Sequence, residues 1–143
     1  MKDSITKEIV LNHSIDGVWN SITNAKSLAT WWFEEANFKA KKGYQYIFSS
    51  PHEGCVPIIG EVLSADPYAL VYTWIVQGTN VVTTVSWKLE ASEQGTKLIL
   101  EHSGISKYAG DTAVAMFNSF NGGWTNCMVD LANHLEHTNT YAG

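Results

Sequence analysis

The spacing of hydrophobic residues changes along the chain. Over residues 5–12 the positions Ile5, Ile9 and Leu11 share one parity, which predicts a β-strand. Ser14 then stands where a helix N-cap is expected, ahead of apolar residues at helical spacing. Asn24 begins a second short helical segment that ends near the two tryptophans at 31–32. We therefore expect one strand followed by two short helices.

The middle of the chain has the short segments and turn residues of an antiparallel meander. These segments are rich in β-branched and aromatic residues, and turn signals such as Asp66-Pro67, Gly78 and Gly95 separate them. Their regular spacing predicts about six strands. The expected strands are residues 33–40, 44–51, 56–65, 69–76, 81–91 and 96–104.

The last third of the chain has helical periodicity. One apolar stripe advances by three or four residues at a time, which predicts a single long helix over about residues 111–136. The stripe consists of Phe117, Phe120, Trp124, Met128, Leu131 and Leu135. Because such a helix must bury its stripe against the large apolar surface of the sheet, the pattern predicts an α+β fold.

Gly122 and Gly123 interrupt this helical pattern directly before Trp124. Glycine in a helix interior is about 1 kcal/mol less favourable than alanine. Two explanations stay open. Either the pair lets the helix approach the sheet closely or bend, or it starts the helix after an ordinary loop. In both cases we expect Trp124 to face the sheet.

The composition adds an expectation about the ligand. Six tryptophans, six tyrosines and five phenylalanines are a heavy aromatic load for 143 residues, and they either fill the core or line a pocket. The formal net charge is −5 and the chain has no arginine. Nucleic acids favour a basic face, and anions favour a guanidinium. We therefore expect no nucleic-acid partner and favour an uncharged ligand.

The chain has the length of one domain, which we expect to cover residues 1–143. No run approaches 18 consecutive apolar residues, so no membrane span is expected, and the polar opening is unlike a secretory signal. Cys55 and Cys127 form no C-x-x-C pair. We expect a cytoplasmic protein with free, buried thiols.

Four segments give the chain a resemblance to a known family. They are IDGVWNSITNAKSLATWW, GEVLSADPYALVYTW, GTKLILEHSG, and GGW with the leucine spacing that follows it. Over about residues 4–136 the chain resembles the single-domain relatives of the activator of the heat-shock protein 90 ATPase. These relatives lie within the START and birch-pollen-allergen (SRPBCC) superfamily.

The resemblance implies a helix-grip fold. In that fold a curved antiparallel sheet of about seven strands wraps around the long C-terminal helix, and two short helices lie between the first and second strands. It also implies a cavity between sheet and helix, in which many members of the superfamily bind hydrophobic small molecules and some act as enzymes. A chaperone is a further partner that it suggests, although full-length chaperone activators resemble this chain in one domain only.

Strand parity, together with residues at the ends of the sheet, identifies the candidate lining of such a cavity. For each aromatic residue the alternative is ordinary core packing, because both roles place a ring on the inner face of the sheet. Val85, Leu98 and Leu100 share that face. The candidate ligand-binding residues are Trp31, Phe48, Tyr72, Trp74, Trp87, His102, Phe117, Phe120 and Trp124.

His102 is a weak candidate for catalysis. It ends an apolar alternation, so its ring should point inward and place a titratable group beside the hydrophobic wall. It either orients a ligand or moves a proton, or it is a structural histidine hydrogen-bonded at the strand end. Glu101 should point to the opposite face, so the two do not form an acid–base pair.

Other reactive residues suggest little chemistry. His134 and His137 lie three positions apart near the helix end, but no third ligand is evident, and we expect no metal site. Cys127 lies on the apolar stripe, where a buried thiol is inert. The chain has no G-x-S-x-G motif and no glycine-rich phosphate or dinucleotide loop, so we expect no cofactor.

These observations support three hypotheses of function. The first is a module that binds an uncharged lipid-like or aromatic molecule in an internal cavity without chemistry. The second is a cyclase- or hydrolase-type enzyme that uses the same cavity, with His102 as its acid–base group. The third is a chaperone-associated protein that acts through surface contact.

Overall fold

The computed structural model describes residues 3–51 and 56–142, with side chains up to residue 136. Seven antiparallel strands form one sheet in the order β1-β7-β6-β5-β4-β3-β2. The strands are β1 (Ile5–Leu11), β2 (Glu35–Asn37), β3 (Gln45–Ser49), β4 (Ile58–Asp66), β5 (Ala69–Val76), β6 (Thr83–Ser92) and β7 (Gly95–Ser103).

Two short helices and one long helix accompany the sheet. The short helices α1 (Ile15–Thr23) and α2 (Ala25–Trp31) lie between β1 and β2. The predicted cap at Ser14 is confirmed, because Ser14 Oγ accepts from the Gly17 amide. Asn24, where the second helical segment was expected to begin, is the N-cap of α2, and its Oδ1 accepts from two amides of the first turn. A 3₁₀ turn, η1 (Ile105–Lys107), leads into the long helix α3 (Gly110–Ala142).

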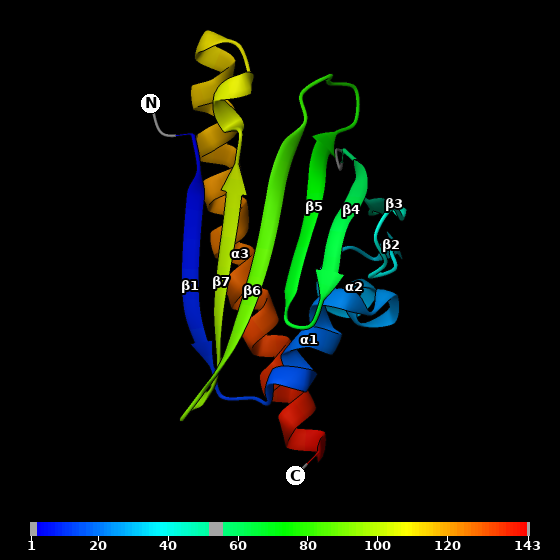
Figure 1. The fold of residues 1–143 in the computed structure, drawn as a ribbon, viewed down its shortest axis with the longest axis vertical. Helices are drawn as coiled ribbons and strands as arrows, with labels where there is room; N and C mark the ends of the chain where they lie inside the picture. Colours follow the sequence, from blue (N-terminus) through cyan, green and yellow to red (C-terminus); the bar gives the residue numbers. More distant parts are fainter. Residues whose placement is uncertain (1–2, 52–55, 143) are drawn as a thin grey trace.

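The helix α3 lies along one face of the sheet. In Figure 1 it runs behind β1, β7 and β6, and α1 and α2 lie near the lower end of the sheet. The backbone of α3 approaches β1, α1 and α2 closely. The predicted α+β helix-grip architecture is therefore confirmed.

The sequence predicted correctly which side of each central strand faces α3. Val85 of β6 pairs with Tyr72 of β5 on one side and with His102 of β7 on the other, and all three are buried. Glu101, next to His102, is exposed on the opposite face. Since side chains alternate along a strand, one buried face and one outer face result.

The apolar stripe of α3 is buried over most of its length. Trp124, Met128, Leu131 and Leu135 are in the core, whereas the aromatic residues nearer its start are half-buried. The helix continues beyond the predicted end at residue 136. None of the described helices is long and apolar enough to cross a membrane.

One predicted strand is much shorter than expected. Instead of residues 33–40, only Glu35–Asn37 is extended and paired, with β3. The chain leaves α2 through Trp32, whose φ of −126° and ψ of −91° are not those of a strand. Trp32 and Phe33 are half-buried and pack against the core, and this turns the chain away from an extended path.

The glycine pair lies within a continuous helix. The explanation that Gly122 and Gly123 start the helix after a loop is wrong, because α3 begins at Gly110. Close approach to the sheet is also wrong, since a Cβ added at either glycine would meet no atom within 4 Å. Trp124 faces the sheet as predicted and is 3% exposed.

Candidate functional site

A small hollow lies between the sheet and α3. Its volume is about 130 Å³. Its wall combines β5, the first half of α3, and the segment that follows α2. The lining residues are Trp32, Phe33, Trp74, Phe120, Gly123 and Trp124. Five of the six are aromatic and none is charged, so the site suits an uncharged ligand with flat, apolar surfaces.

Three of the predicted ligand-binding residues line this hollow: Trp74, Phe120 and Trp124. Phe117 is half-buried and packs on the core without lining the hollow. The other predicted residues are buried core residues that do not line it: Trp31, Phe48, Tyr72, Trp87 and His102.

Sequence reasoning missed Trp32, Phe33 and Gly123 as lining residues. The adjacent aromatic residues at the end of α2 were the available signal for the first two, because rings that follow a helix end without periodicity must still be buried somewhere. The signal for Gly123 was its unfavourable presence inside a helix.

Trp32 occupies the middle of the space between sheet and helix. Its ring centroid lies 5.4 Å from that of Phe48, 5.9 Å from that of Trp74 and 5.6 Å from that of Trp124. It therefore touches strands β3 and β5 on one side and α3 on the other. Its ring forms part of the wall of the hollow.

A buried hydrogen-bond network fixes the state of His102. The hydroxyl of Thr83 donates to the carbonyl oxygen of Trp74 at 2.9 Å, and Thr83 Oγ1 lies 2.7 Å from Nε2 of His102. Because the hydroxyl hydrogen is already used, His102 Nε2–H must be the donor in the second contact. Nδ1 of His102 then accepts from the indole N–H of Trp124 at 2.9 Å.

His102 is therefore a neutral, fully hydrogen-bonded histidine. Burial lowers its pKa to about 4, because the charged ring would lose hydration. Neither ring nitrogen has a free lone pair or hydrogen for a substrate, and the ring does not line the hollow. The geometry gives it a structural role, which is to hold the indole of Trp124 in the wall.

The other reactive residues named in the sequence analysis are Cys127, His134, His137 and Cys55. Burial raises the pKa of the Cys127 thiol, which keeps it protonated. His134 stacks against Trp31, with ring centroids 6.5 Å apart, and the side chain of His137 lies outside the described residues, as does Cys55. Within the described part of the chain, no group of three or more side chains has the geometry of a metal site.

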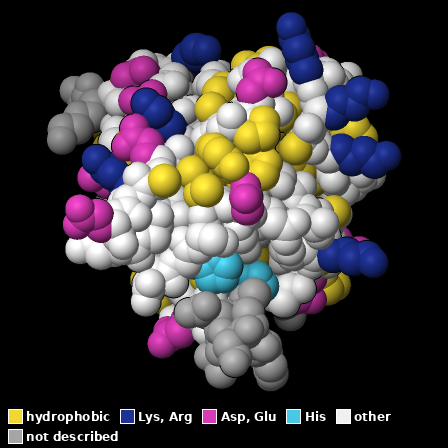
Figure 2. All heavy atoms as spheres, turned by 60° about the horizontal axis from the view of Figure 1, so that its bottom comes forward, with side chains coloured by type: hydrophobic (Ala, Val, Ile, Leu, Met, Phe, Trp, Pro, Cys, Tyr) yellow, Lys and Arg dark blue, Asp and Glu magenta, His cyan; other side chains and the backbone are white. Residues whose placement is uncertain are grey.

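A larger groove lies on the opposite, outer face of the sheet. Its volume is about 560 Å³. Its lining includes four aliphatic residues from β3, β4 and β5 and one that directly precedes β6: Ile47, Ile59, Leu63, Ile75 and Val82. Leu63 and Val82 are 41% and 40% exposed. Figure 2 shows hydrophobic side chains gathered in one area of the surface in that view.

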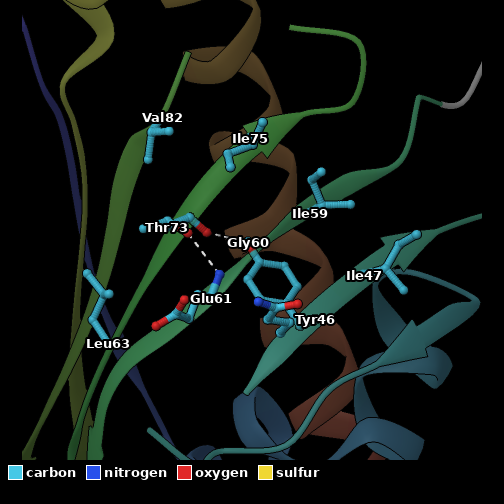
Figure 3. A pocket seen from close by; sticks show the side chains of 10 residues that line it. Tyr46, Ile47, Ile59, Gly60, Glu61, Leu63, Thr73, Ile75 and Val82 are labelled. Carbon is cyan, nitrogen blue, oxygen red and sulfur yellow. Dashed lines mark hydrogen bonds between the residues drawn. The ribbon is translucent and has the colours of Figure 1, made fainter. Parts of the chain in front are cut away.

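A gap in the β4–β5 ladder forms the floor of this groove (Figure 3). Tyr46 donates its hydroxyl to the carbonyl oxygen of Thr73 at 2.5 Å, and the Glu61 amide donates to the Thr73 hydroxyl at 2.8 Å. A Cβ on Gly60 would lie 2.2 Å from that same carbonyl oxygen. Only glycine leaves room for this arrangement.

The comparisons with known proteins agree with this architecture. A sequence profile of the family described as "Activator of Hsp90 ATPase homolog 1-like protein" matches residues 12–136. The chain belongs to this family. No curated protein matches the chain.

Solved structures share the fold of this Hsp90-activator-like family. Protein MLL2253 from Mesorhizobium loti is 21% identical, with a TM-score of 0.81 over 94% of this chain and 98% of its own. Protein BH1534 from Bacillus halodurans is 26% identical, with a TM-score of 0.74 over 94% and 97%. The Aha1 dimer from Colwellia psychrerythraea is 19% identical, with a TM-score of 0.79 over 94% and 97%.

Proposed function

We propose that the protein binds an uncharged hydrophobic small molecule, aromatic or lipid-like, in the hollow between β5 and α3. The observation that carries this proposal is the lining itself, five aromatic side chains and Gly123 around about 130 Å³. The helix-grip fold of the family supports a ligand-binding domain in general terms. An aromatic wall without charge favours ligands that would leave no buried ion unpaired.

The size of the hollow limits what binds without rearrangement. Pockets for drug-sized ligands are typically about 300–1,000 Å³, whereas a cavity of about 150 Å³ holds benzene. At about 130 Å³ the hollow accepts roughly one ring of a ligand. A longer ligand requires Trp32, Phe33 or Phe120 to turn aside, and all three are half-buried rather than fully enclosed.

The proposal is binding without catalysis. None of the six lining residues carries a group that titrates near neutral pH. His102, the acid–base candidate, has both nitrogens in hydrogen bonds and lies outside the lining. A cyclase or hydrolase would need a positioned acid or base beside its substrate, and the hollow supplies none.

The glycine pair provides a matched test of this site. Gly123 lines the hollow, Gly122 does not, and both have open space where a side chain would begin. Gly123→Leu should therefore fill the mouth of the hollow, whereas Gly122→Leu adds the same side chain outside it. Binding of α-methylstyrene, followed by chemical shifts of the protein, should saturate in the unmodified chain and weaken at least about tenfold in Gly123→Leu only.

Two results would count against the binding proposal. One is that no probe, neither α-methylstyrene nor the larger flavonoids, sterols and fatty acids, causes a saturable change in the chemical shifts of the protein. The other is an equal loss of affinity in the Gly122→Leu control, which would place the probe elsewhere.

Two broader expectations belong to the same proposal. We take residues 1–143 to act as one domain. This is supported by the antiparallel pairing of β1 with β7, two strands that lie far apart in the sequence. We also propose a cytoplasmic location, because Cys127 is a buried free thiol that suits a reducing compartment.

A second candidate function is contact with a chaperone ATPase through the outer groove. The exposed aliphatic residues of this groove and the printed description of the family favour it. Leu63→Asp should then abolish binding to a purified Hsp90-type chaperone, and Val10→Asp should not, since Val10 is exposed on the edge strand β1. Failure of the unmodified protein to bind or stimulate the chaperone would remove this candidate.

A further inference from the structure

The buried tryptophans differ in how their indole N–H groups are satisfied. Trp31 donates to the carbonyl oxygen of Ser21 at 2.9 Å, and Trp87 donates to the hydroxyl of Tyr72 at 2.8 Å. Trp124 donates to His102. Trp74 is 5% exposed, yet its Nε1 has no acceptor among the described residues.

The unpaired donor belongs to a residue of the hollow. Trp74 lines it together with Trp124, whose ring centroid lies 5.0 Å away. The partnered tryptophans Trp31 and Trp87 lie outside the lining. Buried polar groups in folded proteins are nearly always hydrogen-bonded, so an unpaired one on a residue that lines the hollow requires an explanation. The nitrogen itself is covered, so an acceptor in the hollow reaches it only when a half-buried lining ring moves aside.

We infer that the ligand of this hollow carries an uncharged hydrogen-bond acceptor, such as a ketone, ester or ether oxygen, which accepts from the indole N–H of Trp74. This inference rests on the proposed binding function and narrows its ligand class. A purely hydrocarbon ligand would bury the N–H without a partner, which is unfavourable. A carboxylate would place an unpaired charge among aromatic rings, since the lining contains no cation.

The inference predicts which of two similar probes binds better. Acetophenone and α-methylstyrene have nearly the same size and the same arrangement of heavy atoms, but only acetophenone has a carbonyl oxygen. The ratio of their dissociation constants should change by about threefold to tenfold in favour of α-methylstyrene when Trp74→Phe removes the donor. Using the ratio cancels the different hydration of the two probes, and benzoate, as the charged analogue, should bind more weakly than acetophenone.

A direct readout does not depend on the variant. In the unmodified protein, acetophenone should move the indole proton resonance of Trp74 downfield, and α-methylstyrene should not. Trp32→Phe is the matched control, because Trp32 also lines the hollow. The ratio of the two dissociation constants should be the same in Trp32→Phe as in the unmodified protein.

The outcomes separate this inference from the binding proposal. If neither probe binds, the binding proposal fails. If both bind but the ratio is unchanged in Trp74→Phe and the indole resonance does not respond, the inference is wrong and the N–H faces a neighbouring ring instead. If the ratio of dissociation constants changes in Trp32→Phe and stays unchanged in Trp74→Phe, the donor is Trp32, and the inference is wrong in this case as well.

Discussion

Trp124 of the long helix donates its indole N–H to Nδ1 of His102 on β7, 2.9 Å away. This hydrogen bond joins α3 to the sheet at one wall of the hollow. It also explains why a histidine stands in an otherwise apolar position, since its second nitrogen is held by Thr83. A neutral imidazole can donate from one nitrogen and accept at the other, and both functions are used here.

Stability should fall as the pH is lowered from about 6.5 to about 4. The folded-state pKa of His102 is lowered to about 4, from an ordinary value of 6.5, because the ring is buried. Between these values the unfolded chain binds the proton and the folded chain does not, so acid favours unfolding. The stabilisation is fully present above pH 6.5, and about 3 kcal/mol of it is lost by pH 4.

Urea unfolding at several pH values measures this effect. Carboxylates also titrate in this range, so the comparison with His102→Gln isolates the histidine. The slope of stability against pH should be smaller in that variant. Equal slopes in the two proteins would show that His102 is not the neutral buried group described above.

Trp124→Phe should raise the pKa of His102. Without the indole donor, Nδ1 has a free lone pair, and the neutral form loses the hydrogen bond that favours it. An unpaired buried acceptor also costs about 1–3 kcal/mol of stability. Proton titration of the His102 ring by NMR measures the first effect, and Trp87→Phe is the control, because the indole N–H of Trp87 donates to Tyr72 and not to His102. An unchanged pKa in Trp124→Phe would contradict the assigned tautomer.

Alanine should stabilise the chain at both Gly122 and Gly123. A Cβ at either position meets open space, so helix propensity alone decides the result. Each substitution should add up to about 1 kcal/mol to the free energy of unfolding. Destabilisation of either variant in urea titrations would mean that the helix is tightly packed at the pair.

Alanine at Gly60 should have the opposite effect. Its Cβ would lie 2.2 Å from the carbonyl oxygen of Thr73 and 2.8 Å from the Tyr46 ring. Overpacking of this kind typically costs about 1–3 kcal/mol. Thermal unfolding should show a lower midpoint for Gly60→Ala and a raised or unchanged one for Gly122→Ala. A midpoint that Gly60→Ala leaves unaltered would show that β4 and β5 can separate without loss.

Three of the six residues that line the hollow were predicted from the sequence, and three were not. Trp74, Phe120 and Trp124 were predicted because strand parity and helical spacing assign side chains to a face. Tyr72 stands on the same face of the same strand as Trp74, yet it lies in the core and does not line the hollow. Parity cannot separate the two, because the position of Trp32 between sheet and helix decides which rings remain uncovered.

The sequence by itself determined the order of the elements, the cap at Ser14, the start of the second helix at Asn24 and the inward face of the sheet, because these follow from local periodicity and turn chemistry. The tertiary structure alone decided that Trp32 and Phe33 line the hollow between the sheet and α3. It also decided that both ring nitrogens of His102 are hydrogen-bonded, one to Thr83 and one to Trp124. It also decided that the indole N–H of Trp74 has no acceptor among the described residues. Those outcomes depend on contacts between side chains that are far apart in the sequence, and local patterns do not predict such contacts.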